Sequence, residues 1–396
     1  MSRRGSTFSE RIHFEKQANF PTDIGSFNIG CKLASSHFDG STFLLTKRAD
    51  ISEDKLYVTR KIDAEKLTTK DLQLIQDELN ILNRLDHPNI TKFFSCFVIS
   101  EGFILTVYPL SDYGSCHDII GAHFKNGLPS LLVGIILRSV VLALEHLHSL
   151  KIVHRAVKAS HILLDSDGSV CLTGLRYCKQ LPCDQQICHS FPDHGLHMLA
   201  WIAPEILRQN LSGYGTSSDI YSLGITAVEL ITGTIPYSKL RPTEVLLQKL
   251  KGVVPQLPDS ATIEEMHCDL SSSNTSLDGL EQTNDMMSVG SSASICSNSK
   301  RIRNLQQFVD ICLNTDPLQR PIACHLKSSP YLKHVKSKLK NKLLPSFSEQ
   351  LKDVQPINQF IPYDHDCSSE MEQVMQKVPS VTLNDEGNDQ QDQWVF

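Results

Sequence analysis

The chain lacks several features that would place it in other classes of protein. It has no run of about 18 apolar residues, so we expect no segment that spans a bilayer. No apolar stretch follows its first residues, so we expect no secretory signal. A net charge of −6 favours neither a nucleic-acid surface nor an anionic-membrane surface. We therefore expect no membrane and no nucleic acid among its partners.

Metal-ligand spacing is also missing from the cysteines. Twelve cysteines are scattered along the chain, and none forms a C-x-x-C pair with the spacing of a zinc site. We expect reduced thiols, many of them buried as small apolar residues. Cys178, Cys183 and Cys188 recur at intervals of five, which leaves open a metal or redox cluster in that loop.

The chain has the composition of an ordinary globular protein, and its hydrophobic pattern changes along the sequence from strand-like to helical. The chain has 396 residues, 40% hydrophobic and 21% charged, enough for one two-lobed domain with tails. Strand patterns occur over 27–62, 93–97 and 103–107, and apolar residues at helical spacing occur over 69–85. These patterns predict a small lobe of five strands and one helix.

After residue 114 the pattern becomes helical. The spacing predicts helices over 131–150, 217–230 and 305–313. A β-rich lobe followed by an α-helical lobe predicts an α+β fold.

Three segments have too few large apolar residues to form a core. We expect residues 1–23 to be disordered, residues 258–302 to be a disordered insertion rich in Ser, Asn, Asp and Gly, and residues 337–396 to be a flexible tail. This tail ends in Trp394 and Phe396. Large aromatic side chains on a polar segment are typical anchors for a partner's pocket, although they could also fold back on their own domain.

The central motif is a degenerate catalytic loop. Residues 154–164 read like the H-R-D-L-x-x-x-N loop of protein kinases, with Ala156 at the place of the catalytic Asp and His161 at the place of the metal-binding Asn. Gly174-Leu175-Arg176 stands where D-F-G would supply a metal-binding carboxylate. Three degenerate positions in a retained framework predict a kinase fold kept for binding, with no catalytic residues.

The nucleotide-binding motifs are altered as well. Arg60 occupies the place of the V-A-I-K lysine, and we expect it to pair with Glu78 in the following helix, unless Glu78 is only a solvated helix charge. Residues 33–39 replace the Gly-rich loop, and we assign Ser36 to the nucleotide site. Side chains there would hinder the close approach of backbone amides to phosphates.

The motifs that hold a kinase C-lobe together are intact. Glu205 lies in an A-P-E sequence, and Arg320 lies near the end of the domain, where it is expected to pair with Glu205. With Asp219, these residues are expected to stabilise the helical lobe, which requires no catalysis.

In this order the motifs resemble a protein kinase over residues 24–336, with an N-lobe of about 24–113 and a C-lobe of about 114–336. In detail they resemble the sterile-twenty-related adaptor (STRAD) pseudokinases. The resemblance rests on the amino-acid sequence of residues 154–163, 174–176, 218–222 and 246–250. It extends to the terminal Trp-Val-Phe, which is similar to the family's Trp-Glu-Phe but lacks its acid at Val395.

The resemblance implies an inactive adaptor in a closed, kinase-like conformation. Such an adaptor allosterically activates a serine/threonine kinase of the liver kinase B type, docks on the armadillo-type Mo-twenty-five scaffold, and acts in cell polarity in the cytoplasm and nucleus. The family can bind ATP without a required metal. Arg60, Lys158 and Arg176 could then supply the positive charge, unless Lys158 and Arg176 only pair with local carboxylates. The alternatives are a plain scaffold with an empty nucleotide cleft and an atypical kinase with residual activity.

Overall fold

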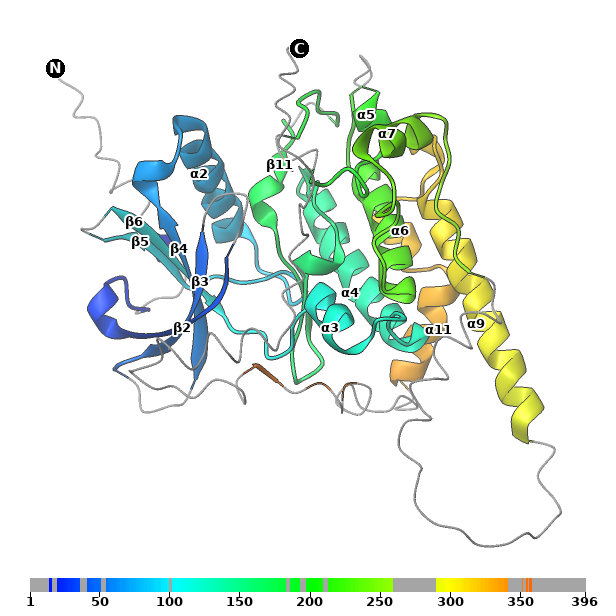
Figure 1. Ribbon diagram of the computed structural model, residues 1–396, viewed down its shortest axis with the longest axis horizontal. Helices are drawn as coiled ribbons and strands as arrows, with labels where there is room; N and C mark the ends of the chain where they lie inside the picture. Colours follow the sequence, from blue (N-terminus) through cyan, green and yellow to red (C-terminus); the bar gives the residue numbers. More distant parts are fainter. Residues whose placement is uncertain are drawn as a thin grey trace, which may run out of the picture.

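The structure, a computed structural model, has a β-sheet lobe and a helical lobe joined by a short linker (Figure 1). It describes residues 14–15, 20–35, 41–50, 55–99, 102–182, 186–192, 197–208, 213–258, 290–340, 351, 354 and 356–357. This arrangement confirms the α+β, two-lobed kinase fold that the sequence predicts.

The N-lobe is built on one antiparallel sheet. Within the described residues it has six strands in the order β1-β5-β6-β4-β3-β2. Their bounds are β1 Phe14–Glu15, β2 Phe27–Ser35, β3 Thr42–Arg48, β4 Leu56–Asp63, β5 Ser95–Val98 and β6 Phe103–Pro109, with short 3-10 turns at η1 Ile24–Ser26 and η2 Ala64–Lys66. The sequence analysis expected five of these strands and missed β1.

Helix α2 (Thr69–Arg84) is the main helix of this lobe. Thr68 caps it, because its hydroxyl accepts a hydrogen bond from the backbone N–H of Asp71 while the Asp71 carboxylate accepts one from the backbone N–H of Thr68. Ile75, Leu79 and Leu82 lie on one face and are buried, as their helical spacing predicts.

The N-terminal segment corrects one expectation. Residues 1–23 were expected to be disordered, but Phe14 pairs with Cys96 across β1 and β5. Phe20 is buried, and its ring stacks 4.8 Å from the ring of Phe94. Burial of this aromatic side chain in the N-lobe stabilises the segment, and the polar composition around it concealed that signal. The remaining residues of 1–19 lie outside the described part of the chain.

The C-lobe consists mainly of helices. Their bounds are α3 Cys116–His123, α4 Ser130–Ser149, α5 Pro204–Leu207, α6 Ser217–Thr232, α7 Pro242–Leu250, α9 Gly290–Cys312, α10 Ala323–Leu326 and α11 Pro330–Lys340. Short strands and 3-10 turns lie among them: β7 Gly114–Ser115, β8 Ile152–Val153, η3 Ala159–His161, β9 Ile162–Leu164, β10 Val170–Leu172, η4 Leu175–Tyr177, β11 Lys179–Gln180 and η5 Pro317–Gln319.

Helix α4 is more apolar than the sequence analysis allowed for. By length and composition alone it is apolar enough to cross a membrane. However, 67% of that stretch is buried inside the protein, where α4 packs against α6, α10 and α11. The apolar composition is therefore that of a core helix, which meets the same criteria of length and hydropathy.

Two segments expected to be disordered contain helix. Residues 290–302 were assigned to the disordered insertion, but α9 begins at Gly290 and buries Ile302 beside Leu305, one turn further on. Helix α11 continues to Lys340, past the expected start of the flexible tail, and Leu351 and Val354 are buried beyond it. In both places a few apolar residues bury enough surface to order a mostly polar stretch. Residues 259–289 lie outside the described residues.

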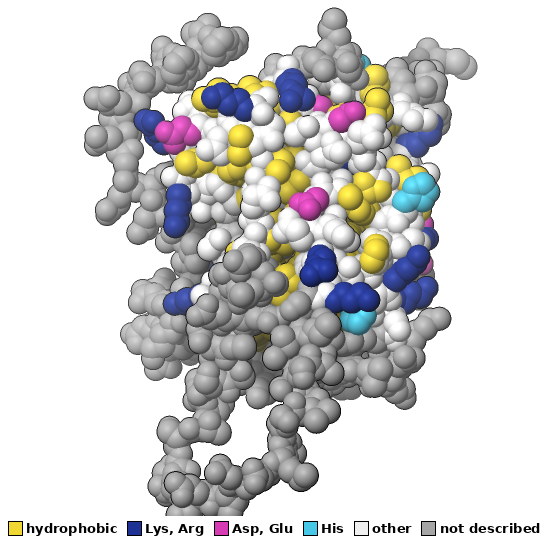
Figure 2. Space-filling model, turned by 90° about the vertical axis from the view of Figure 1, so that its right-hand side faces the viewer, with side chains coloured by type: hydrophobic (Ala, Val, Ile, Leu, Met, Phe, Trp, Pro, Cys, Tyr) yellow, Lys and Arg dark blue, Asp and Glu magenta, His cyan; other side chains and the backbone are white. Residues whose placement is uncertain are grey.

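The face of the C-lobe at the right of Figure 1 has a mixed surface (Figure 2). Apolar side chains lie among Lys, Arg, Asp and Glu side chains on this face (Figure 2). Leu247 of α7 and Ile311 of α9 are among the exposed apolar residues. Interspersed charges of both signs are typical of a soluble surface.

Candidate functional site: a kinase-like cleft and the polar network beneath it

The cleft side of the N-lobe is fixed by an ion pair. Arg60 on β4 reaches Glu78 on α2, with 3.0 Å between its Nη1 and the Glu78 Oε2. Both side chains are buried, so each charge depends on the other for compensation. The ion pair that the sequence predicts is confirmed, and Glu78 is not a solvated helix charge.

Asp219, at the start of α6, anchors the loop at 154–164. Its carboxylate accepts hydrogen bonds from the backbone N–H groups of His154 and Arg155, each at 2.8 Å. Burial raises the pKa of Asp219, but the hydrogen bond with the His148 ring and the charges nearby lower the pKa by a larger amount. The pKa of Asp219 therefore lies below its usual value. Asp219 is therefore an ionised carboxylate that holds the loop from beneath.

His154 sits inside this loop as a neutral imidazole. Burial lowers the pKa of His154 to about 4. Its Nε2–H donates to the carbonyl of Thr173 at 3.0 Å, and its Nδ1 accepts from the backbone N–H of Ala156 at 3.2 Å. The ring thus links the loop to the chain just before Gly174.

The three degenerate positions form one packed unit. His161 donates through Nδ1 to the carbonyl oxygen of Ala156 at 2.7 Å, and its ring stacks on Tyr177. Gly174 has a φ of 85°, and a Cβ at this position would lie 2.6 Å from the His161 Nδ1. Glycine therefore suits position 174 for two reasons. The backbone has a positive φ, and the His161 imidazole fills the space that a side chain would need.

Lys158 contacts the C-lobe. Its ammonium group lies 5.6 Å from the ring centre of Trp201, and burial lowers its pKa while the charge of Glu229 opposes that effect. The Trp201 indole N–H donates to Glu229 at 3.0 Å. Lys158 therefore lies near a carboxylate of its own lobe, as the alternative interpretation of this residue expected.

Arg176 contacts the N-lobe. It lies in η4, its side chain is buried, and its Nη2 lies 3.6 Å from the Asp71 Oδ1 on α2. Arg60 and Arg176 are thus brought to the same helix, one from each lobe, through Glu78 and Asp71. The structure does not place Lys158 with them, and Ser36 lies outside the described residues.

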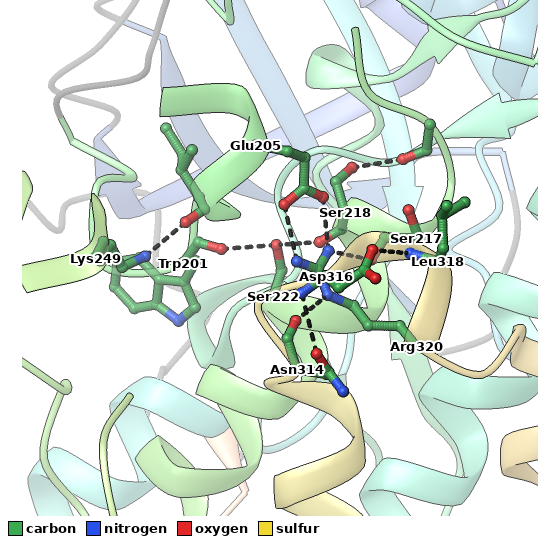
Figure 3. Close-up of polar contacts among 12 residues, drawn as sticks. Trp201, Glu205, Ser217, Ser218, Ser222, Lys249, Asn314, Asp316, Leu318 and Arg320 are labelled. Carbon is green, nitrogen blue, oxygen red and sulfur yellow. Dashed lines mark hydrogen bonds and ion pairs between the residues drawn. The ribbon is translucent and has the colours of Figure 1, made fainter. Parts of the chain in front are cut away.

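The predicted pair of Glu205 and Arg320 is confirmed (Figure 3). The guanidinium binds both carboxylate oxygens, at 2.6 and 2.8 Å, and both side chains are buried. The same guanidinium donates to the carbonyls of Asn314 at 2.7 Å and Ser217 at 3.1 Å. This bidentate geometry links the A-P-E segment to the end of the domain.

Lys249 is a structural residue to which the sequence analysis assigned no role. It is fully buried on α7, and its ammonium group donates to the carbonyls of Ala200 and Ile202, each at 2.6 Å (Figure 3). Burial lowers its pKa well below the usual value. Its spacing from Val245, another buried residue of α7, is four residues and could have indicated a lysine on an inner helix face.

The structure describes only some of the remaining residues that the sequence analysis singled out, which are the loop cysteines and the terminal aromatic residues. Within the described part of the chain, no group of three or more His, Cys, Asp or Glu side chains is placed to hold a metal ion. Cys178 and Cys188 are described and are free thiols, whereas Cys183 is not described. Trp394 and Phe396 also lie outside the described residues.

Comparison with known proteins agrees with this architecture. The protein kinase domain family matches residues 40–332. The chain is 37% identical to human STE20-related kinase adapter protein alpha over 355 residues, which is 87% of this chain and 80% of the relative. It is 36% identical to the rat alpha protein over 344 residues, 84% of this chain and 86% of the relative.

A second group of relatives is more distant. The chain is 32% identical to human STE20-related kinase adapter protein beta over 300 residues, covering 72% of this chain and 71% of the relative. Taken with the fold and the motifs above, these similarities show that the chain belongs to the STE20-related kinase adapter family within the protein kinase domain superfamily.

Proposed function

We propose that the protein is a catalytically inactive adaptor that activates a partner serine/threonine kinase allosterically. The observation that carries this proposal is the position of α2. Arg60 and Arg176 bind it from the two lobes through Glu78 and Asp71, which stabilises a closed, kinase-like conformation by protein contacts alone. A surface held in this conformation can bind a partner kinase without a catalytic cycle.

The cleft residues support the absence of catalysis. The methyl group of Ala156 cannot accept a proton from a substrate hydroxyl, and Gly174 has no side chain to bind a metal ion. In phosphoryl transfer, metal ions supply much of the charge stabilisation. The His161 ring occupies the space beside Gly174, so the two changes are accommodated together.

The partners we propose are a liver kinase B type serine/threonine kinase and an armadillo-type scaffold of the Mo-twenty-five kind, acting in the cytoplasm and nucleus. The relatives are named as kinase adapter proteins, which supports the adaptor role. Trp394 and Phe396 would anchor the tail in a pocket of the scaffold. Each buried aromatic side chain would contribute on the order of 1.5–3 kcal/mol.

ATP without a required metal is the proposed ligand of the cleft. Arg60 faces α2 through its pair with Glu78, and Arg176 and Lys158 add positive charge. A plain scaffold with an empty cleft is the second candidate. It is favoured by the contact of Arg176 with Asp71 and by the placement of Lys158 near Glu229.

Reconstitution tests the adaptor role directly. The purified chain is added to the partner kinase and the scaffold, and phosphorylation of a peptide substrate of that kinase is measured. We expect stimulation by the wild-type chain, less by Arg60→Ala, and full stimulation by Lys327→Ala, whose partly exposed pair with Glu145 lies far from α2 in the sequence. Absence of stimulation by the folded wild-type chain would reject the proposal.

Thermal unfolding separates the two cleft candidates. A ligand selective for the native state raises the melting temperature by mass action. We expect ATP to raise it equally with Mg²⁺ or with EDTA, and Arg176→Ala to reduce the rise. A rise that needs Mg²⁺ contradicts the metal-free assignment, and the lack of any rise favours the plain scaffold.

A further inference from the structure

The linker between the lobes makes contacts that play no part in the proposed adaptor role. Strand β6 ends at Pro109 and β7 begins at Gly114. On one side, the linker is held by the C-lobe, because the backbone N–H of Tyr113 donates to the carbonyl of Leu164 at 3.1 Å and Ser166 donates to the Asp112 carboxylate. We call Asp112, Tyr113 and Gly114 the linker surface.

The other contact comes from the C-terminal part of the chain. Leu351, Val354, Pro356 and Ile357 are the described residues there, which we call the tail segment, and they lie along the lower edge of the molecule between the sheet and α11 (Figure 1). Leu351 and Val354 are 1% and 6% exposed and belong to the main hydrophobic core. The segment is therefore packed into the domain.

Ile357 makes two contacts with the linker surface. Its backbone N–H donates to the carbonyl of Asp112 at 2.6 Å. Its Cδ1 lies 3.2 Å from the position that a Cβ would take at Gly114, where φ is 72°. A residue with a side chain at 114 would be strained and crowded there, so this glycine provides room for the isoleucine.

We propose that the linker surface is a binding site for the tail segment of the same chain, and that Ile357 clamps it to the C-lobe. The tail segment fits because the Ile357 N–H donates to the Asp112 carbonyl and the apolar Ile357 side chain packs against Gly114. Residues 112–114 are then held from two sides, by Leu164 and Ser166 and by Ile357.

This inference goes beyond the adaptor role and can fail separately from it. Hydrogen–deuterium exchange of the full chain tests it, read at the amides of Tyr113 and Gly114, which donate to Leu164 and Ser111. Ile357→Pro removes the donor and should speed exchange of these amides about tenfold, the effect of losing one hydrogen bond. Ile357→Val keeps the donor but lacks the Cδ1 that contacts Gly114, and should speed exchange less than Ile357→Pro. Equal exchange in Ile357→Pro and wild type overturns the proposal.

Two truncations provide the second measurement. A chain ending after Phe360 keeps the tail segment but lacks Trp394 and Phe396, whereas a chain ending after Pro345 lacks both. We expect slow linker exchange in the longer chain and fast exchange in the shorter one. Scaffold binding should be lost in both, because it depends on the aromatic end. Equal linker exchange in the two truncated chains overturns the binding site, whereas retained scaffold binding by the longer chain contradicts only the proposed aromatic anchor.

Discussion

The polar network of the C-lobe and the cleft between the lobes differ in how their charges are compensated. In the C-lobe, Arg320 binds both oxygens of Glu205 at 2.6 and 2.8 Å, and Asp219 accepts two backbone hydrogen bonds at 2.8 Å. In the cleft, Arg176 approaches Asp71 at 3.6 Å. The C-lobe carboxylates are bound at close distance, whereas Arg176 makes a longer contact, although Arg60 and Glu78 pair at 3.0 Å.

The contacts that hold the C-lobe together therefore involve other side chains than those at the altered catalytic-loop positions. The pair of Glu205 and Arg320 ties the A-P-E segment to the end of the domain, and Asp219 of α6 holds the loop at 154–164 through backbone N–H groups. These contacts do not use the side chains at positions 156, 161 and 174. Those positions can therefore change without loss of the fold. Variants in the two regions should affect stability by different amounts.

The largest effect is expected in the C-lobe network. Arg320→Ala leaves the Glu205 carboxylate buried without its partner and should lower the free energy of unfolding by about 3–5 kcal/mol. Urea denaturation followed by circular dichroism measures the loss. The control is Lys327→Ala, which removes a partly exposed pair and should cost no more than about 1 kcal/mol. Similar losses in both variants would contradict the special role of the buried pair.

Asp219→Asn should have the next largest effect, about 1.5–3 kcal/mol, because hydrogen bonds to a charged acceptor are lost. The pKa of Asp219 is lowered in the folded protein, so the folded state binds fewer protons than the unfolded state. Its stabilisation is complete above about pH 4 and is lost as the pH falls. Urea denaturation at several pH values should show a smaller acid dependence in Asp219→Asn than in wild type, and equal dependence would contradict this assignment.

In the cleft, Gly174→Asp should cost about 1–3 kcal/mol, because the positive φ is strained and the side chain meets His161. The cost should be smaller in a His161→Ala background, and a double-mutant cycle measures the coupling. Gly252→Asp is a matched control, since its φ is 79° but a Cβ there would lie 3.4 Å from the nearest atom. Equal losses of stability in Gly174→Asp and Gly252→Asp would show that the His161 imidazole does not clash with a side chain at position 174.

The smallest effect is expected at Asp165, near the linker. Burial and its contact with Asp112 raise the pKa of Asp165 to about 6. Between about pH 4 and pH 6 the folded state binds more protons than the unfolded state, so stability falls as the pH rises through this range. Asp165→Asn should therefore raise the melting temperature slightly at pH 7.5 and leave it unchanged at pH 4. An unchanged melting temperature at pH 7.5 would contradict the raised pKa.

Much of this comparison could be predicted from the sequence. Helical spacing located α2, α4 and α6, and motif order identified the pairs of Arg60 with Glu78 and of Glu205 with Arg320. These features depend on local periodicity or on residue types with one obvious partner.

The rest depends on contacts between distant segments. Phe20 and Ile302 lie in polar stretches, and their burial follows from surfaces that fold elsewhere in the chain, as does the contact of Ile357 with Gly114. The partner of Arg176 could not be chosen from the sequence, because several carboxylates were available and only the packing of η4 on α2 selects Asp71. The fit of His161 against Gly174 likewise requires coordinates.

Transfer of labelled phosphate from ATP tests the central claim most directly. The purified chain is incubated with γ-labelled ATP, Mg²⁺ or Mn²⁺ and generic protein substrates, beside a heat-treated control and a Lys158→Ala variant. The account predicts no incorporation above the control, because Ala156 and Gly174 supply neither the catalytic nor the metal-binding carboxylate. Incorporation by the monomer that is lost on changing Lys158 would contradict the account and show a working kinase.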